Sequence, residues 1–172
     1  KDVQALARTA HDVDYVPALL EAVEAVNDRQ KDYIFNRISE HYRGELAGRT
    51  FAVWGLSFKP NTDDMREAAS RRLLESLWAA GASARVFDPK AMEETQRIYG
   101  NREDLCFCDS AEAALEGADA LVVMTEWNVF RSRDFGLLRQ QLKAPVVFDG
   151  RNVYDPDTLR AEGFDYYAIG RR

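Results

Sequence analysis

The sequence predicts an α/β fold, in which a long connecting helix precedes a doubly wound, mainly parallel sheet of about six strands. Three observations support this prediction. Apolar residues recur at helical spacing near the start of the chain, and short apolar runs alternate with amphipathic stretches after Gly48. In addition, a chain of 172 residues with 46% hydrophobic residues is long enough to bury a core. A sheet of this kind is Rossmann-like.

The segment from Tyr15 to about Tyr42 has the apolar spacing of a helix. Polar residues separate the apolar ones, which are Val16, Leu19, Leu20, Val23, Val26, Ile34 and Ile38. One helix over this range would extend roughly 40 Å, so we expect it to bridge domains or subunits. Gly44 and Gly48 mark its end. We therefore expect a helical connector at residues 1–46 and a ligand-binding domain at 47–172.

After Gly48, the short apolar runs predict strands and the amphipathic stretches between them predict helices. The predicted strands are about 50–55, 84–87, 105–107, 119–124, 146–148 and 165–168. The predicted helices are about 66–80, 90–99, 110–116, 134–142 and 156–162. Strands that alternate with helices in this way pair in parallel, and the helices cover both faces of the sheet.

Composition argues against several classes of protein. The formal net charge of −6 is unfavourable for coating a nucleic acid. No apolar run approaches the ~18 residues that a membrane span needs, and residues 1–20 lack the pattern of a signal peptide. We therefore expect a cytoplasmic protein without a nucleic-acid or membrane partner.

The two cysteines, Cys106 and Cys108, stand two positions apart, a spacing that directs both side chains to one face of a strand. We expect buried thiols, because free cysteines are often found in protein cores. A C-x-C pair without neighbouring ligands is weak support for a metal site, and His11 and His41 are isolated in the sequence. No metal site is predicted.

The loop after the first strand is the first candidate for a ligand site, because open parallel sheets bind ligands beyond the carboxyl ends of their strands. Its sequence at 55–67 is GLSFKPNTDDMRE. After Gly55 it lacks the further glycines of a dinucleotide-binding G-x-G-x-x-G, so a complete NAD site of that type is not expected here. The loop instead places Lys59 at the strand end and Arg66 on the following helix, after a cap region at 61–63.

Two other strand ends add to this loop. Thr125-Glu126-Trp127 follows the fourth strand, and Asp149-Gly150-Arg151-Asn152 follows the fifth. In the usual strand order these loops and the first one converge. Lys59 alone could be an ordinary surface charge. Together with Arg151, it could bind a diphosphate, while Phe58 or Trp127 forms an apolar wall for a base or ribose.

Asp88 ends the second strand, where a Rossmann site carries its ribose-binding acid. The Asp88-Pro89 pair could equally be a turn that ends the strand. Asp88 is therefore left out of the predicted site.

The same motifs resemble a known family. The segment at 55–67, the Thr125-Glu126-Trp127 and Phe130-Arg131 segments, FDGRN at 148–152 and KDVQAL at 1–6 are similar to the C-terminal third of the UDP-glucose/GDP-mannose dehydrogenases. The resemblance covers essentially the whole chain. The segments at 125–127 and 149–152 resemble the UDP-glucose enzymes more than those that act on GDP-mannose or N-acetyl sugars.

The resemblance implies that the intact enzyme oxidises UDP-glucose to UDP-glucuronate, with two hydride transfers to NAD through a cysteine thioester. In the family, Cys-Phe-Pro would precede Lys1, so the nucleophile is expected upstream of this chain. Asp2 matches the catalytic aspartate that helps water attack the thioester. Lys1 matches a lysine that contacts NAD, which the missing N-terminal domain is expected to hold for the most part.

The family motifs also assign roles to residues of the sheet domain. Lys59, with Phe58, matches a substrate-phosphate contact, and Arg151 matches a further substrate contact. Arg66 matches an arginine that reaches NAD. The resemblance further implies a homodimer, with the long helix in the interface and residues 47–172 as the UDP-sugar-binding domain. By itself, the chain is expected to be inactive.

Two alternatives remain open. The first is another nucleotide-sugar dehydrogenase of the family, acting on GDP-mannose or a UDP-N-acetyl sugar. The second is a non-catalytic module for nucleotide binding and dimerisation, since a fold alone does not establish catalysis.

Overall fold

The computed structural model describes residues 2–171; Lys1 and Arg172 lie outside the described residues. The chain divides into two compact units, with unit 1 extending to Tyr33 and unit 2 beginning at Ile34. This boundary precedes the one expected at residue 46. The connector, dimerisation and ligand-binding roles expected for the two domains stay predictions.

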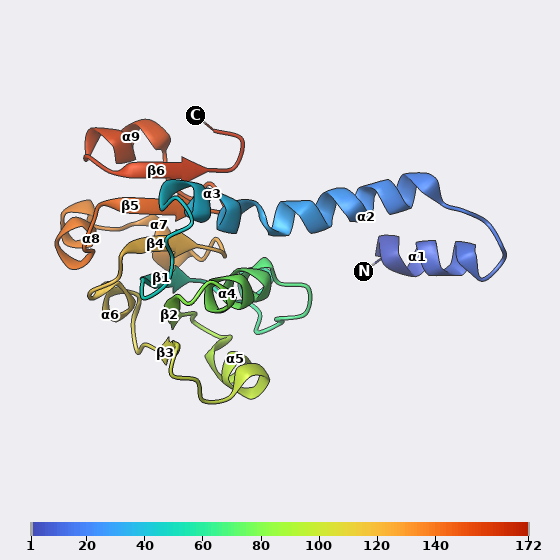
Figure 1. Cartoon of the computed structure of the whole chain (residues 1–172), viewed down its shortest axis with the longest axis horizontal. Helices are drawn as coiled ribbons and strands as arrows, with labels where there is room; N and C mark the ends of the chain where they lie inside the picture. The colour runs from blue at the N-terminus through green and yellow to red at the C-terminus, as the bar shows by residue number, and fades with distance from the viewer. Residues whose placement is uncertain (1, 172) are drawn as a thin grey trace. The chain divides into compact units, whose positions relative to one another are not determined.

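Unit 1 contains two helices that contact each other, α1 (Asp2–His11) and α2 (Ala18–Lys31) (Figure 1). The sequence did not predict α1, because no capping signal precedes it. None of the residues of α2 is buried in the described chain. Several of the large apolar side chains in unit 1 are instead exposed: Leu6, Val13, Tyr15, Val16, Leu19, Val23 and Val26.

The long helix predicted over 15–42 is present as two segments. Asp32 separates α2 from α3 (Tyr33–His41), although its backbone keeps right-handed helical angles, with φ −85° and ψ −9°. Ile34 and Ile38, one turn apart, are buried in unit 2. His41 Nδ1 lies 2.8 Å from the Tyr167 hydroxyl, so α3 is fixed against the last strand of the sheet.

The sheet has six parallel strands in the order β3-β2-β1-β4-β5-β6 (Figure 1). The strands are β1 (Thr50–Trp54), β2 (Ser83–Phe87), β3 (Leu105–Phe107), β4 (Ala120–Val123), β5 (Val146–Asp149) and β6 (Asp165–Ala168). This confirms the predicted doubly wound α/β fold. The winding reverses between β1 and β4, so the carboxyl ends of these two strands adjoin.

Helices cover both faces of the sheet, with α3, α4 and α5 toward one side and α6 and α8 toward the other (Figure 1). The remaining helices are α4 (Ala69–Ala79), α5 (Met92–Tyr99), α6 (Ala111–Leu115), α7 (Asn128–Arg131), α8 (Phe135–Gln141) and α9 (Pro156–Ala161). The four-residue α7 was not predicted, because it is too short to show a period.

The core lies along the central strands. All residues of β4 and β5 are buried, as are Phe51 to Trp54 of β1. Covering both faces accounts for their continuous apolar runs, since neither face meets water. On one face, Trp54 stacks on Phe130 with ring centroids 5.1 Å apart and donates a 2.9 Å hydrogen bond to the Ala111 carbonyl.

The expectation of buried thiols holds for Cys108 and is wrong for Cys106, which is exposed. Their sulfur atoms lie 4.0 Å apart. Burial, followed by the charge of Cys106, raises the pKa of Cys108 to about 11. Within residues 2–171, no helix is long and apolar enough to cross a membrane, and no three His, Cys, Asp or Glu side chains are grouped as metal ligands.

Candidate functional site

The guanidinium group of Arg151 joins three strand-end loops. Its Nε donates to the Met124 carbonyl at 2.8 Å, and its Nη2 donates to the Phe58 carbonyl at 3.2 Å. Nε also lies 3.4 Å from Glu126 Oε2. Met124 and Glu126 follow β4, Phe58 follows β1, and Arg151 itself follows β5. The structure therefore confirms that the three loops converge.

The loops after β1 and β4 lie directly against each other at Gly55. Its φ is +87°, and a Cβ atom added there would lie 2.5 Å from Cβ of Thr125. Just beyond, the buried Thr125 hydroxyl donates a 2.6 Å hydrogen bond to the Ser57 carbonyl. Glycine is required at this position both for its backbone angle and for the close approach.

The side chains of Phe58 and Lys59, in the loop after β1, are exposed to solvent. The Phe58 amide donates to the Asp64 carbonyl at 2.8 Å, which closes the loop into a compact turn. Phe58 is 49% exposed, and Lys59 is exposed as well. Among residues 2–171, the Lys59 ammonium group has neither an ion-pair nor a hydrogen-bond partner. The site thus presents an available cation beside an accessible aromatic ring.

Arg66 lies before α4, whereas the sequence placed it on that helix. The Asp64 carboxylate accepts hydrogen bonds from the Arg66 amide at 2.9 Å and from its guanidinium at 2.9 and 2.8 Å. This pairing raises the pKa of Arg66. The local bonds, together with a φ of +59° at Glu67, delay the helix until Ala69. Arg66 remains 69% exposed but is already paired.

Asp88, which directly follows β2, is a structural residue, in line with the turn that the sequence analysis kept as an alternative. Its side chain is buried, and Oδ2 accepts from the Leu56 amide at 2.7 Å and from the Ser57 amide and hydroxyl, each at 3.2 Å. Oδ1 accepts from the amides of Lys90 and Ala91. A carboxylate used in this way is not available to a ribose, which favours the turn interpretation.

Trp127 does not form the apolar wall suggested by the sequence. Its side chain is buried, and the indole Nε1 donates to Asp88 Oδ2 at 3.1 Å. Phe58 is therefore the exposed aromatic residue of the converging loops. The sequence gives the residue types at these positions, but it does not show that Trp127 points inward while Phe58 points outward.

The roles expected for Lys1 and Asp2 stay predictions. Lys1 lies outside the described residues. Asp2 begins α1, but its side chain is not among those described.

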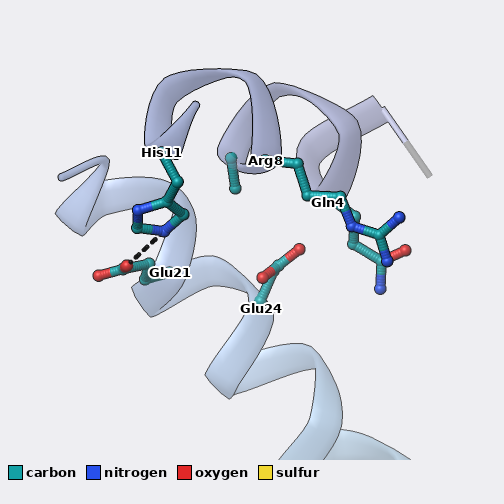
Figure 2. Close-up of a pocket in the computed structure, with 6 residues that line it drawn as sticks. Gln4, Arg8, His11, Glu21 and Glu24 are labelled. Carbon is teal, nitrogen blue, oxygen red and sulfur yellow. Dashed lines mark ion pairs between the residues drawn. The ribbon is translucent and has the colours of Figure 1, made fainter. Parts of the chain in front are cut away.

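Unit 1 has its own cavity, of about 290 Å³, between α1 and α2 (Figure 2). The side chains that line it are Gln4, Ala7, Arg8, His11, Glu21 and Glu24. Figure 2 shows the ion pair between His11 and Glu21, whose Nε2 and Oε1 atoms are 3.0 Å apart. None of the strand-end residues lines this cavity.

Comparison with known proteins identifies the family of the chain. The model of the UDP-glucose/GDP-mannose dehydrogenase family, UDP binding domain, matches residues 52–156. The chain belongs to the UDP-glucose/GDP-mannose dehydrogenase family. This confirms the resemblance carried by the strand-end motifs, since the matched range includes the loops after β1, β4 and β5.

Relatives within this dehydrogenase family match nearly the whole chain. UDP-glucose 6-dehydrogenase of Pseudomonas aeruginosa is 46% identical over 99% of the chain and 38% of its own length. A UDP-glucose dehydrogenase structure from Pyrobaculum islandicum has a TM-score of 0.80 and 29% identity, covering 97% of this chain and 35% of that one. An NDP-N-acetyl-D-galactosaminuronic acid dehydrogenase structure from Methanosarcina mazei has a TM-score of 0.82 and 27% identity, covering 100% and 37%. The chain thus spans 35–38% of the length of these relatives.

Proposed function

We propose that the chain supplies the UDP-sugar-binding part of an NAD-dependent UDP-glucose 6-dehydrogenase that forms UDP-glucuronate. The observation that carries this proposal is the exposed Phe58 and Lys59 pair at the point where three strand-end loops meet. The 46% identity with a UDP-glucose 6-dehydrogenase supports the choice of sugar.

In this proposal, Lys59 contacts the diphosphate and Phe58 packs against the base or ribose. An ammonium group without an internal partner can pair with phosphate oxygens without first breaking another bond. Arg151 would hold the loops together and also reach the substrate. Within residues 2–171, its Nη1 has no hydrogen-bond partner and thus keeps donors for a ligand.

The strand-end loops do not fit a dinucleotide. The loop after β1 has one glycine, and the acid at the end of β2, Asp88, is occupied by internal donors. We therefore assign NAD, which would accept the hydrides, mainly to a domain outside this chain. Lys1 and Arg66 would contribute contacts from this side, and Arg66 would have to exchange its pairing with Asp64. Asp2 would activate the water that attacks the thioester.

A homodimer is part of the proposal. The apolar residues on α2, including Leu19 at 78% exposure, are not buried within the described chain. Leu19, Val23 and Val26 have the i, i+4, i+7 spacing of one helix face, and an exposed apolar face is typical of an interface with another protein.

A binding measurement tests the proposed site. Titration calorimetry of the chain with UDP should show weaker affinity for Lys59→Ala, because a hydrogen bond to a charged group contributes about 1.5–3 kcal/mol. This corresponds to roughly ten- to 150-fold in Kd. Lys143→Ala is the matched control, since Lys143 pairs with Asp119 near the amino ends of β4 and β5, whereas the site lies at the carboxyl ends of the strands. Equal affinities for the wild type and Lys59→Ala would remove Lys59 from the site.

A second candidate function is oxidation of a different nucleotide sugar. The TM-score of 0.82 with an N-acetyl-sugar dehydrogenase favours it, because the fold accommodates both sugars. A competition experiment, in which UDP-glucose, GDP-mannose or a UDP-N-acetyl sugar displaces bound UDP, distinguishes the candidates. Tighter binding of UDP-glucose supports the first proposal, whereas tighter binding of either competitor contradicts it.

A further inference from the structure

The buried carboxylate of Asp88 connects three segments of the sheet domain. It accepts two amide hydrogen bonds from the loop after β1, at Leu56 and Ser57, and one from the indole of Trp127 in the loop after β4. Its other oxygen accepts the amides of Lys90 and Ala91 at 2.8 and 2.9 Å, just before α5. Asp88 is only 1% exposed, so these donors replace the water that a carboxylate would otherwise bind.

The residues that Asp88 holds come immediately before the exposed pair of the proposed site. Ser57 is fixed from two directions, by Asp88 at its amide and hydroxyl and by the Thr125 hydroxyl at its carbonyl. The next two residues, Phe58 and Lys59, are the ones that reach solvent. The direction in which the chain leaves Ser57 therefore sets where the backbone of Phe58 and Lys59 lies, and with it the region that the Lys59 ammonium group can reach.

We infer that Asp88 is a positioning residue of the nucleotide site, which orders the loop after β1 so that Phe58 and Lys59 are held ready for a nucleoside diphosphate. This inference rests on the proposed function. The ligand contact belongs to Lys59, and Asp88 acts through the backbone of Leu56 and Ser57.

Replacing Asp88 with Asn tests the role of the carboxylate with little change in shape. Both Asp88 oxygens face N–H donors, so either orientation of the amide sets its NH₂ group against other donors. The loop would then populate other conformations. The apparent Kd for UDP rises in inverse proportion to the fraction of molecules whose loop is competent to bind.

The experiment is a double-mutant cycle read by titration calorimetry with UDP, on the full chain and well below its melting temperature. Asp88→Asn should raise the Kd by roughly tenfold or more. Lys59→Ala should have a smaller effect in the Asp88→Asn background than in the wild-type background, because a misplaced ammonium group contributes little. A residue that only stabilises the fold would leave the effect of Lys59→Ala the same in both backgrounds.

Leu77→Ala is the stability control. Leu77 is fully buried near the end of α4, and its carbonyl accepts the Ala82 amide just before β2, at the amino ends of the strands and away from the site. This variant should melt at a lower temperature and keep its affinity for UDP. If Asp88→Asn does not fold, the double variant Ser57→Ala/Trp127→Phe takes its place in the cycle. This double variant removes two donors to the Asp88 carboxylate, the Ser57 hydroxyl and the Trp127 indole.

The outcomes are distinguishable. An unchanged Kd in Asp88→Asn, or an equal effect of Lys59→Ala in both backgrounds, overturns the inference and leaves the proposed function standing. A wild-type chain that gives no binding heat with UDP overturns the proposed function, and the inference falls with it.

Discussion

At the scale of single residues, Gly55 shows how closely two strand-end loops approach. Its backbone has a positive φ, and the space where a Cβ would lie is filled by Thr125. Both conditions exclude other residue types. The contact matters for the site because Thr125 also holds Ser57, which leads directly into Phe58 and Lys59.

Gly55→Ala should destabilise the sheet domain by about 2–5 kcal/mol. Left-handed backbone angles cost about 1–2 kcal/mol in residues with a Cβ, and overpacking adds about 1–3 kcal/mol. Urea unfolding followed by circular dichroism measures the change. Gly117→Ala is the matched control, because Gly117 has φ +68° but nothing within 4 Å of its Cβ position. Equal losses in the two variants would contradict the steric explanation.

The sequence indicated the arrangement of some strand-end residues better than that of others. Arg151 and Lys59 could be singled out because cationic residues after buried strands are distinctive, and Arg151 does bring the strand-end loops together. The turn interpretation of Asp88 was among the alternatives, but its bonds to the Leu56 amide and the Trp127 indole could not be predicted, because they are tertiary contacts. Whether Trp127 points inward depends on the burial of its indole against Asp88, which is a tertiary contact.

At the scale of elements, strands were predicted more accurately than helix boundaries. The predicted strands at 105–107 and 165–168 match β3 and β6, three others differ by one residue at one end, and the prediction at 119–124 exceeds β4 by one residue at each end. The start of α4 was wrong by three residues, because the Asp64 side chain bonds to Arg66 in place of helical hydrogen bonds. Periodicity also could not show that Asp32 divides the long helix, since apolar spacing continues through it.

The exposed face of α2 leads to a prediction about association. Leu19→Asp places a charge in the proposed interface, so we expect the homodimer to dissociate, with a lower mass in size-exclusion chromatography with light scattering. Because Leu19 is 78% exposed in the chain, unit 2 should stay folded. Asn27→Asp adds the same charge at a polar, exposed position of α2 and should leave the mass unchanged. A dimer that persists in Leu19→Asp would exclude this face.

At the scale of the whole molecule, the fold and the family are established, whereas catalysis requires groups assigned elsewhere. The chain contributes six parallel strands, a strand-end loop with an exposed lysine, and a helical segment. It spans 38% of a relative that matches 99% of it. We therefore expect this chain to bind UDP without oxidising UDP-glucose.

Incubation of the chain with NAD and UDP-glucose should produce no reduced cofactor, because the proposed cysteine and most of the NAD site are assigned outside it. The measurement is the absorbance of reduced NAD over time, with an intact UDP-glucose 6-dehydrogenase as positive control. UDP binding by the same sample shows that the protein is folded. Steady formation of reduced NAD by the chain alone would refute this division of roles.

Within the described chain, α2 has no buried residues, and this has a thermodynamic consequence. Isolated helices shorter than ~12–15 residues are only marginally stable in water, and α2 has 14 residues. In the proposed homodimer, the helical state of α2 and the association of two chains are linked equilibria, so each favours the other by mass action. Helical content of the chain would then fall on dilution, while the sheet of unit 2, with its own core, would be insensitive to protein concentration.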